Sequence, residues 1–179
     1  MNPDRAAVPT RSSRATRQWR KRNLRRGKRG ALIAPDLMRG HELIREYYDC
    51  FNERRFADAA ELFAEDAVLE HGPVGQRQLG GAGYIRVAEM WVHAFPDVNL
   101  KIVHVEQHGD TICEVDLIGT GTHEGTFDVG PNGTFKPTGA HATLRLRELL
   151  EIRVGKITYS SLSFDLHELI RQLRPGESA

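Results

Sequence analysis

The chain has 179 residues, of which 40% are hydrophobic and 27% charged, and its net charge at pH 7 is +1. This length suits one domain with a buried core and is short for two. No apolar run approaches the roughly 18 residues of a membrane span, so we expect no membrane association. Cys50 and Cys113 are isolated thiols. They have neither metal-site nor disulfide-scaffold spacing, which indicates a reducing, cytoplasmic location.

The net charge hides a strongly basic N-terminal segment. Residues 1–30 hold eleven of the 25 Lys and Arg residues against one acid, Asp4, so a segment of charge +10 precedes a body of −9. The stretch RSSRATRQWRKRNLRRGKRG offers little to bury, which predicts that residues 1–37 form a disordered tail. Open alternatives are a solvated arm, a targeting sequence, a nucleic-acid arm, or a start-site artefact with Met38 as the true start. Nucleic-acid binding is not expected to define the function.

Helical periodicity dominates the first half of the remaining chain. HELIREYYDCFNE, residues 41–53, repeats its apolar positions at helical spacing, and residues 56–63 and 82–94 do the same. Between the last two, AVLEHGPVG alternates with period two and ends at a Gly-Pro turn. We therefore predict three N-terminal helices, with a short strand before the third.

Strand patterns dominate the second half. Four segments alternate as strands do, and a short helix follows at residues 166–173 before a flexible C-terminus at 175–179. The four segments are residues 98–109, 111–122, 141–154 and 156–165. This order predicts one α+β domain over residues 38–174: a cone-shaped barrel in which three N-terminal helices pack on a curved, mainly antiparallel sheet.

Two strands carry polar groups among apolar ones. Along residues 142–154, Glu148 shares a face with leucines that include Leu146 and Leu150. By the same alternation, Tyr159, Ser161 and Asp165 share a face of the last strand. A carboxylate on an apolar face is costly unless it is paired or protonated, and such groups commonly serve acid–base chemistry.

The connection THEGTFDVGPNGTFKPTGA, residues 122–140, is unusually long for a compact domain. Its glycines and prolines exclude a helix, and long ordered loops tend to form lids or site walls. The simpler alternative is that these residues only terminate strands.

Four stretches resemble SnoaL-like polyketide cyclases of the nuclear-transport-factor-2-like superfamily, and the resemblance covers about residues 41–173. They are FNERRFADAAELFAEDAVLEHGP, AFPDVNLKIVHVEQHGDTICEVDLIGTGTHEG, KPTG and GKITYSSLSFDLHELIRQL. The paired THxG and PTG motifs are its most specific part. The resemblance implies chemistry without a cofactor or metal inside the cone, a loop packed near the cavity mouth, and assembly as a homodimer or homotetramer.

The resemblance also implies a catalytic residue. In these cyclases an aspartate exchanges protons with an acidic carbon, and its place falls on Asp165 here. A carboxylate with a raised pKa in an apolar pocket suits that task. The alternative is that Asp165 caps the helix at 166–173.

A second comparison, with ketosteroid isomerases of the same superfamily, places Tyr47, His71 and Glu148 on the positions of their pocket tyrosine, base aspartate and protonated aspartate. The histidine replaces the base, so isomerase chemistry does not transfer directly, although a histidine can act as a base near neutral pH. The simpler alternatives are a core aromatic, a buried histidine and a solvent-facing glutamate.

Two departures from the cyclase pattern concern the cavity wall. Ser161 stands where relatives carry a bulky aromatic residue, and Ala140 stands where they carry arginine after Pro-Thr-Gly. Because both positions bear on the cavity wall, the resemblance does not identify the substrate.

The leading hypothesis is a polyketide- or ester-cyclase acting on a small apolar carbonyl compound through an enolate. Asp165, His71 and Glu148 are the candidate catalytic residues, and the candidate substrate-binding residues are Tyr47, Trp91, His123, Leu146, Leu150, Tyr159 and Ser161. The alternatives are a non-catalytic ligand-binding or assembly module, and a related isomerase or hydrolase.

Overall fold

The structure is a computed structural model that describes residues 34–130 and 133–174. The expected basic tail, apart from residues 34–37, and the expected flexible C-terminus lie outside these ranges. The helices are α2 (Ala34–Asn52), α3 (Phe56–Glu61), the short 3-10 helix η1 (Gly72–Val74), α4 (Gly80–Ala94) and α5 (Leu166–Leu173). The strands are β1 (Phe63–His71), β2 (Gln76–Leu79), β3 (Asn99–His108), β4 (Ile112–Thr122), β5 (Phe127–Asp128), β6 (Thr134–Phe135), β7 (His141–Arg153) and β8 (Lys156–Phe164).

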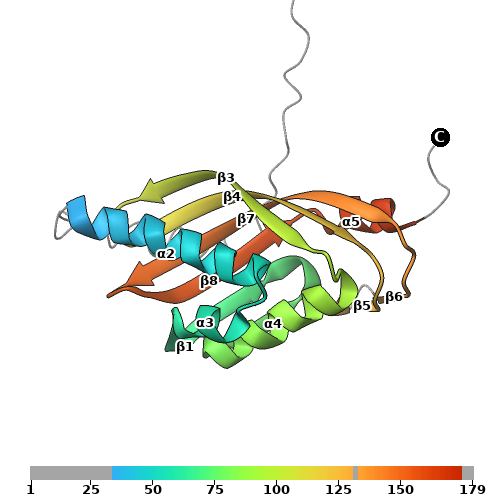
Figure 1. Cartoon of the computed structure of the whole chain (residues 1–179), viewed down its shortest axis with the longest axis horizontal. Coiled ribbons are helices and arrows are strands. Elements are labelled where there is room, and N and C mark those ends of the chain that lie inside the picture. Colours follow the sequence, from blue (N-terminus) through green and yellow to red (C-terminus); the bar gives the residue numbers. More distant parts are fainter. Residues whose placement is uncertain (1–33, 131–132, 175–179) are drawn as a thin grey trace, which may run out of the picture.

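Helices α2, α3 and α4 lie along one side of a curved sheet, as Figure 1 shows. The six strands run in the order β2-β1-β8-β7-β4-β3, and the sheet does not close. Every neighbouring pair is antiparallel except β1 and β8, which run parallel. The α+β fold expected from the sequence is confirmed, with an open sheet curved around its helices.

The helical and strand periodicities place most elements within a few residues of their predicted bounds. The first helix differs most, because α2 begins at Ala34 rather than at His41. The long connection also holds a small hairpin, β5–β6, which lies with α5 at the end of the molecule opposite the start of α2 (Figure 1).

One apolar cluster joins the helices, the sheet and the long connection. It includes Tyr48 from α2, Tyr84 from α4, Leu117 from β4 and Phe127 from β5. These side chains are at most 3% exposed. The connection therefore belongs to the same core as the sheet.

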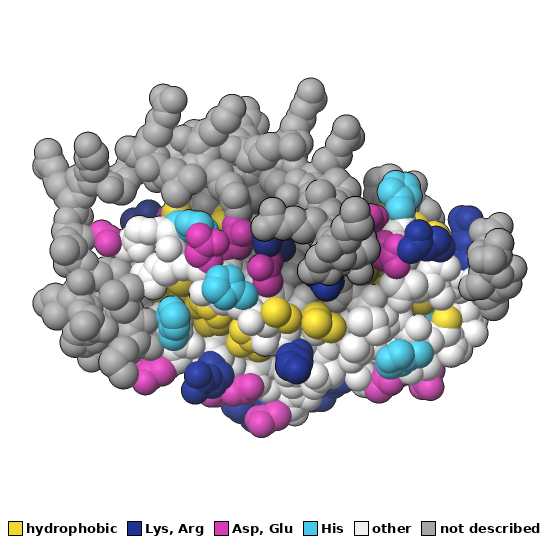
Figure 2. Space-filling model, turned by 90° about the horizontal axis from the view of Figure 1, so that it is seen from above, with side chains coloured by type: hydrophobic (Ala, Val, Ile, Leu, Met, Phe, Trp, Pro, Cys, Tyr) yellow, Lys and Arg dark blue, Asp and Glu magenta, His cyan; other side chains and the backbone are white. Residues whose placement is uncertain are grey.

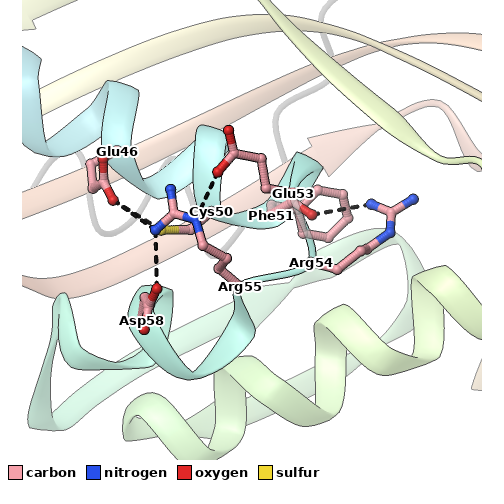
Figure 3. Close-up of polar contacts among 7 residues, drawn as sticks. All are labelled: Glu46, Cys50, Phe51, Glu53, Arg54, Arg55 and Asp58. Atoms are coloured by element: carbon pink, nitrogen blue, oxygen red, sulfur yellow. Dashed lines mark hydrogen bonds and ion pairs between the residues drawn. The ribbon is translucent and has the colours of Figure 1, made fainter.

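Arg54 ties the turn between α2 and α3 to the segment before β3. Its φ of 62° lies in the left-handed region, which is unusual for a residue with a side chain. The guanidinium donates to the carbonyl oxygen of Phe51 at 3.1 Å (Figure 3), and also to those of Pro96 at 2.9 Å and Val98 at 2.8 Å. These hydrogen bonds offset the strained backbone and tie the helices to the segment before β3.

Arg55 lies next to it and gathers three carboxylates (Figure 3). It pairs with Glu53 at 2.7 Å, Glu46 at 3.0 Å and Asp58 at 3.1 Å. Glu46 also accepts a hydrogen bond from the thiol of Cys50 at 3.2 Å. Burial raises the pKa of Cys50 to about 11. The thiol therefore stays protonated at neutral pH, and this cluster is structural.

No helix among the described residues is long and apolar enough to cross a membrane.

Candidate functional site

A mainly apolar pocket lies between the sheet and helices α2 and α4, with a volume of about 80 Å³. Its lining follows β7 from Ala142 to Glu148, a distance of six residue steps or roughly 20 Å of strand. The space is therefore narrow for its length. The other lining residues are Tyr47, Tyr48, Phe51, His71, Tyr84, Val87, Ala88, Trp91, Phe95, Val98, Leu100, Gly119, Thr120, Gly121, Leu144, Leu146, Leu162 and Leu169.

Glu148 is the carboxyl group of this pocket and is only 3% exposed. Three hydroxyl groups donate to it: Tyr48 at 2.7 Å, Tyr47 at 3.3 Å, and Ser160. Burial raises the pKa of Glu148 above its ordinary value, and the three hydrogen bonds partly offset that rise. The side chain faces inward, so the alternative of a solvent-facing glutamate is wrong.

His71 reaches the same pocket from the end of β1. The parallel pair β1–β8 aligns His71 with Leu162, and the antiparallel pair β7–β8 aligns Leu162 with Glu148. All three residues line the pocket, so they form one row across three strands on its wall. Two strand spacings separate the backbones of His71 and Glu148 by roughly 10 Å. A small group lying over Leu162 would have the imidazole on one side and the carboxyl on the other.

The imidazole of His71 is 6% exposed, and its Nδ1 has no hydrogen-bond partner among the described residues. Burial lowers its pKa to about 4, so the ring is neutral at pH 7. In the tautomer with the proton on Nε2, Nδ1 is a buried acceptor that can take a proton.

Two further polar atoms on α4 are buried and unmatched within the described part of the chain: the hydroxyl of Tyr84 and the indole N–H of Trp91. Both residues line the pocket. Burial raises the pKa of Tyr84 well above its ordinary value, which keeps its hydroxyl protonated. The pocket thus holds polar atoms that have no partner among the described residues, as a ligand site does.

A β-bulge in β8 changes which of its side chains face the pocket. Ile152 aligns with Ile157, but Glu151 aligns with Tyr159, so Thr158 is an extra residue. Its hydroxyl donates to the carbonyl oxygen of Glu151 at 3.2 Å and to its carboxylate at 3.0 Å. Beyond the bulge the alternation is reversed relative to the prediction.

Tyr159 and Ser161 therefore lie on the opposite face of the sheet from the pocket, which corrects the expectation that they share its wall. Tyr159 packs with Ile112 and Leu149, and its hydroxyl donates to Glu70 at 2.7 Å. The inward residues are instead Ser160, which contacts Glu148, Leu162, which lines the pocket, and Phe164, whose ring packs against Trp91.

Asp165 is exposed and caps α5, where its carboxylate accepts a hydrogen bond from the backbone N–H of Glu168 at 3.1 Å. It is not among the residues that line the pocket. The capping alternative is thus observed, and the catalytic role of Asp165 stays a prediction.

His123 holds the long connection together and does not line the pocket. Its backbone N–H donates to Ala140, its carbonyl oxygen accepts from Thr138 and Gly139, and its Nδ1 lies 3.1 Å from the Thr138 hydroxyl. Gly125 is needed where the connection meets the end of α4, because a Cβ there would lie 1.8 Å from the carbonyl oxygen of His93. The two motifs therefore build one loop, which supports the wall behind Trp91 through Phe127.

Of the other expected site residues, Tyr47, Trp91 and Leu146 line the pocket, whereas Leu150 is fully buried in the core beside it. Three site residues were not predicted: Tyr48, Tyr84 and Ser160. Tyr48 and Tyr84 fall on the apolar faces of their helices, where a hydroxyl is the available signal. The signal for Ser160 is hidden by the bulge.

Charged groups gather on the other face of the sheet. One ligand atom each from Glu106, His108 and Glu114 lies within 4.8 Å of the others. Arg147 pairs with Glu114 at 3.1 Å and with Asp116 at 2.6 Å, and its positive charge opposes a cation there. Acidic side chains and histidines also lie side by side in Figure 2, which views the molecule from above. We assign the cluster of Glu106, His108 and Glu114 to ion pairing.

Comparison with known proteins gives the family. A model of the SnoaL-like polyketide cyclase family matches residues 41–173. Among curated protein sequences, none matches the chain.

Solved structures share the fold at low sequence identity. A proposed SnoaL-like polyketide cyclase from Jannaschia sp. CCS1 is 16% identical with a TM-score of 0.68, over 82% of this chain and 99% of that one. IdmH, a proposed polyketide cyclase from Streptomyces antibioticus, is 23% identical with a TM-score of 0.62, over 74% and 96%. A protein from Catenulispora acidiphila with a ketosteroid isomerase-like fold, in complex with trimethylamine, is 16% identical with a TM-score of 0.62, over 73% and 91%.

Proposed function

The chain belongs to the SnoaL-like polyketide cyclase family, and we propose that it catalyses acid–base chemistry on a small apolar carbonyl compound bound in the pocket. The observation that carries this proposal is the row of His71, Leu162 and Glu148 on the pocket wall. It places a neutral base and a carboxyl of raised pKa on either side of one apolar side chain. Two titratable groups whose pKa values are shifted in opposite directions are typical of sites that carry out enolate chemistry.

The reaction begins with the carbonyl oxygen of the ligand near Glu148 and its α-carbon near His71. Nδ1 of His71 takes the α-proton, and the electron pair of the broken C–H bond forms the enolate. Hydrogen bonds from Tyr47 and from the protonated form of Glu148, which burial favours, stabilise the oxyanion. Burial disfavours an isolated imidazolium, but here the enolate forms beside it, so the pair carries no net charge.

Cyclisation follows if the ligand holds a second carbonyl group. The enolate carbon attacks that carbonyl carbon, which forms the new C–C bond and an alkoxide. The imidazolium of His71 returns its proton to the alkoxide, and the enzyme regains its starting state. These reaction steps together consume no oxidant, reductant or water.

The test is α-proton exchange of a simple ketone in deuterated buffer, followed by NMR. We expect Glu148→Gln and His71→Leu each to lower the exchange rate at least 100-fold, since general acid–base groups contribute about that much. Asp165→Asn is the matched control, because asparagine caps a helix as well as aspartate does. We expect it to retain the rate.

A loss in Asp165→Asn equal to that in Glu148→Gln would restore the role that the family resemblance gives to Asp165. Ligand binding without exchange in the wild type would favour the non-catalytic binding module. The narrow pocket volume of about 80 Å³ is the observation that keeps this second candidate in view. Assembly as a homodimer or homotetramer and a cytoplasmic location stay predictions.

A further inference from the structure

Trp91 carries a buried polar atom that the proposed reaction does not use. Its ring packs against Phe127 at 5.1 Å, Phe164 at 5.6 Å and Phe95 at 6.0 Å between ring centroids. The indole N–H is buried, and no acceptor for it exists within residues 34–130 and 133–174. With the ring held on three sides, the N–H cannot turn toward another group without disrupting this packing.

An indole N–H is a donor only, and leaving it unmatched in a protein interior is costly. The residue lines the pocket. An acceptor on the ligand, such as a ketone, ester or ether oxygen, would complete this site.

The position of Trp91 on α4 sets where that acceptor lies. Tyr84 and Trp91 are seven residues apart on one helix and both line the pocket. Two helical turns separate them by about 10 Å along the helix axis. Tyr84 lies at the end that holds Glu148, since its ring centroid is 5.5 Å from that of Tyr47, which contacts the carboxyl.

Between these two residues α4 lines the pocket with Val87 and Ala88, and β7 lines it with Leu144 and Leu146, all of them apolar. A ligand that joins the two polar points must therefore be slender and apolar in its middle section.

We propose that Trp91 is a specificity-determining residue whose N–H binds a second oxygen of the substrate, about 10 Å from the carbonyl group at Glu148. The substrate class is an elongated carbonyl compound with two separated oxygen functions. This inference rests on the proposed function for the position of the reacting carbonyl.

The test uses two probes and two proteins, with the full chain throughout. One probe is a medium-chain straight β-keto ester, and the other is the same ester with a second keto group about 10 Å farther along the chain. Each is titrated by calorimetry into the wild type and into Trp91→Phe, which keeps an aromatic ring and removes the donor.

We expect the second keto group to tighten binding by the wild type about tenfold, the size of one buried hydrogen bond, and to give no gain in Trp91→Phe. The ester without it should bind the two proteins equally. Equal weakening of both esters in Trp91→Phe would assign the residue to packing alone and overturn the proposal. No gain in the wild type would overturn it without reference to any variant, and so would failure of both esters to bind.

The proposed reaction is judged separately on the same samples. A tenfold gain from the second ketone, together with α-proton exchange that does not depend on Glu148 or His71, would retain the binding role of Trp91 and reject the catalytic proposal. Glu148-dependent exchange without the gain would do the reverse.

Discussion

His71 and Glu148 are both buried, but they differ in how far their polar atoms are hydrogen-bonded. Three hydroxyl groups satisfy the carboxyl of Glu148, whereas Nδ1 of His71 has no partner in the described part of the chain. An unmatched buried polar group lowers stability and is retained where it has a task. His71 therefore offers a direct test of whether this pocket exchanges stability for activity.

Replacing His71 by leucine removes the unmatched nitrogen and keeps an apolar side chain of similar volume. We expect His71→Leu to raise the free energy of unfolding at pH 7 by about 1–2 kcal/mol, even as it lowers the exchange rate at least 100-fold. Chemical denaturation measures this change, and His167→Gln, at an exposed position on α5, is the neutral control. A destabilised His71→Leu protein would mean that the imidazole is satisfied in solution.

The same residue gives the stability a pH dependence. Burial lowers the pKa of His71 from 6.5 to about 4 in the folded protein, so between these values the unfolded chain binds more protons. The wild type therefore loses stability as pH falls from 6.5 toward 4, relative to its stability above pH 6.5. We expect the stability advantage of His71→Leu over the wild type to grow as pH falls from 6.5 to 4, by about 3 kcal/mol at most. A constant difference across the window would show that the pKa is not lowered.

At the scale of elements, the loop between β4 and β7 depends on one close contact. Gly125 lies against the end of α4, where a methyl group would overlap the carbonyl oxygen of His93. We expect Gly125→Ala to lower the free energy of unfolding by roughly 3 kcal/mol, because the backbone of the loop and the backbone at the end of α4 must both move. Thermal unfolding measures it.

Gly40→Ala is the matched control for that substitution. Gly40 lies within α2, and a Cβ there meets nothing within 4 Å. We expect a gain of about 0.5–1 kcal/mol from helix propensity. Similar losses in both variants would show that the loop contact does not decide the result.

The sequence predicts elements better than it predicts faces. Helix α4 and strand β7 follow from local periodicity, which Glu148 and Trp91 obey, so their inward positions could be foreseen. The faces of β8 could not, because the extra residue Thr158 is fixed by pairing with Glu151 across the sheet. Alternation counted along one strand carries no information about a bulge that its neighbour imposes.

At the scale of the whole molecule, the pocket and the core are one structure. The main apolar cluster contains Tyr47 and Tyr84 from the pocket and also Phe127 and Val129 from the long connection. We therefore expect one cooperative unfolding transition, with coincident curves from far-UV circular dichroism and from Trp91 fluorescence in a Trp19→Phe background. Trp91 is the single tryptophan left in that background. Separate midpoints would mean that the pocket end unfolds on its own.

The α+β order, the family and the inward carboxyl of Glu148 could all be inferred before the structure. The row that joins Glu148 to His71 could not, since it depends on the parallel pairing of β1 with β8, far apart in the chain. No local sequence pattern predicts the register between β1 and β8. The same limit applies to Asp165, whose cap position was foreseen but whose place relative to the pocket depends on where α5 packs.

The bulge at Thr158 also predicts how β8 tolerates shortening. Removal of Thr158 itself would restore simple alternation and leave Ser160, Leu162 and Phe164 pointing inward, since the extra residue is the one lost. Removal of Tyr159 would do the same, with Thr158 taking its outward position, whereas removal of a single residue among 160–164 would bring at least one other side chain into the pocket wall. A codon-by-codon deletion scan of this strand therefore has its permissive positions at the bulge, and a lineage could lose a codon there without altering the pocket wall.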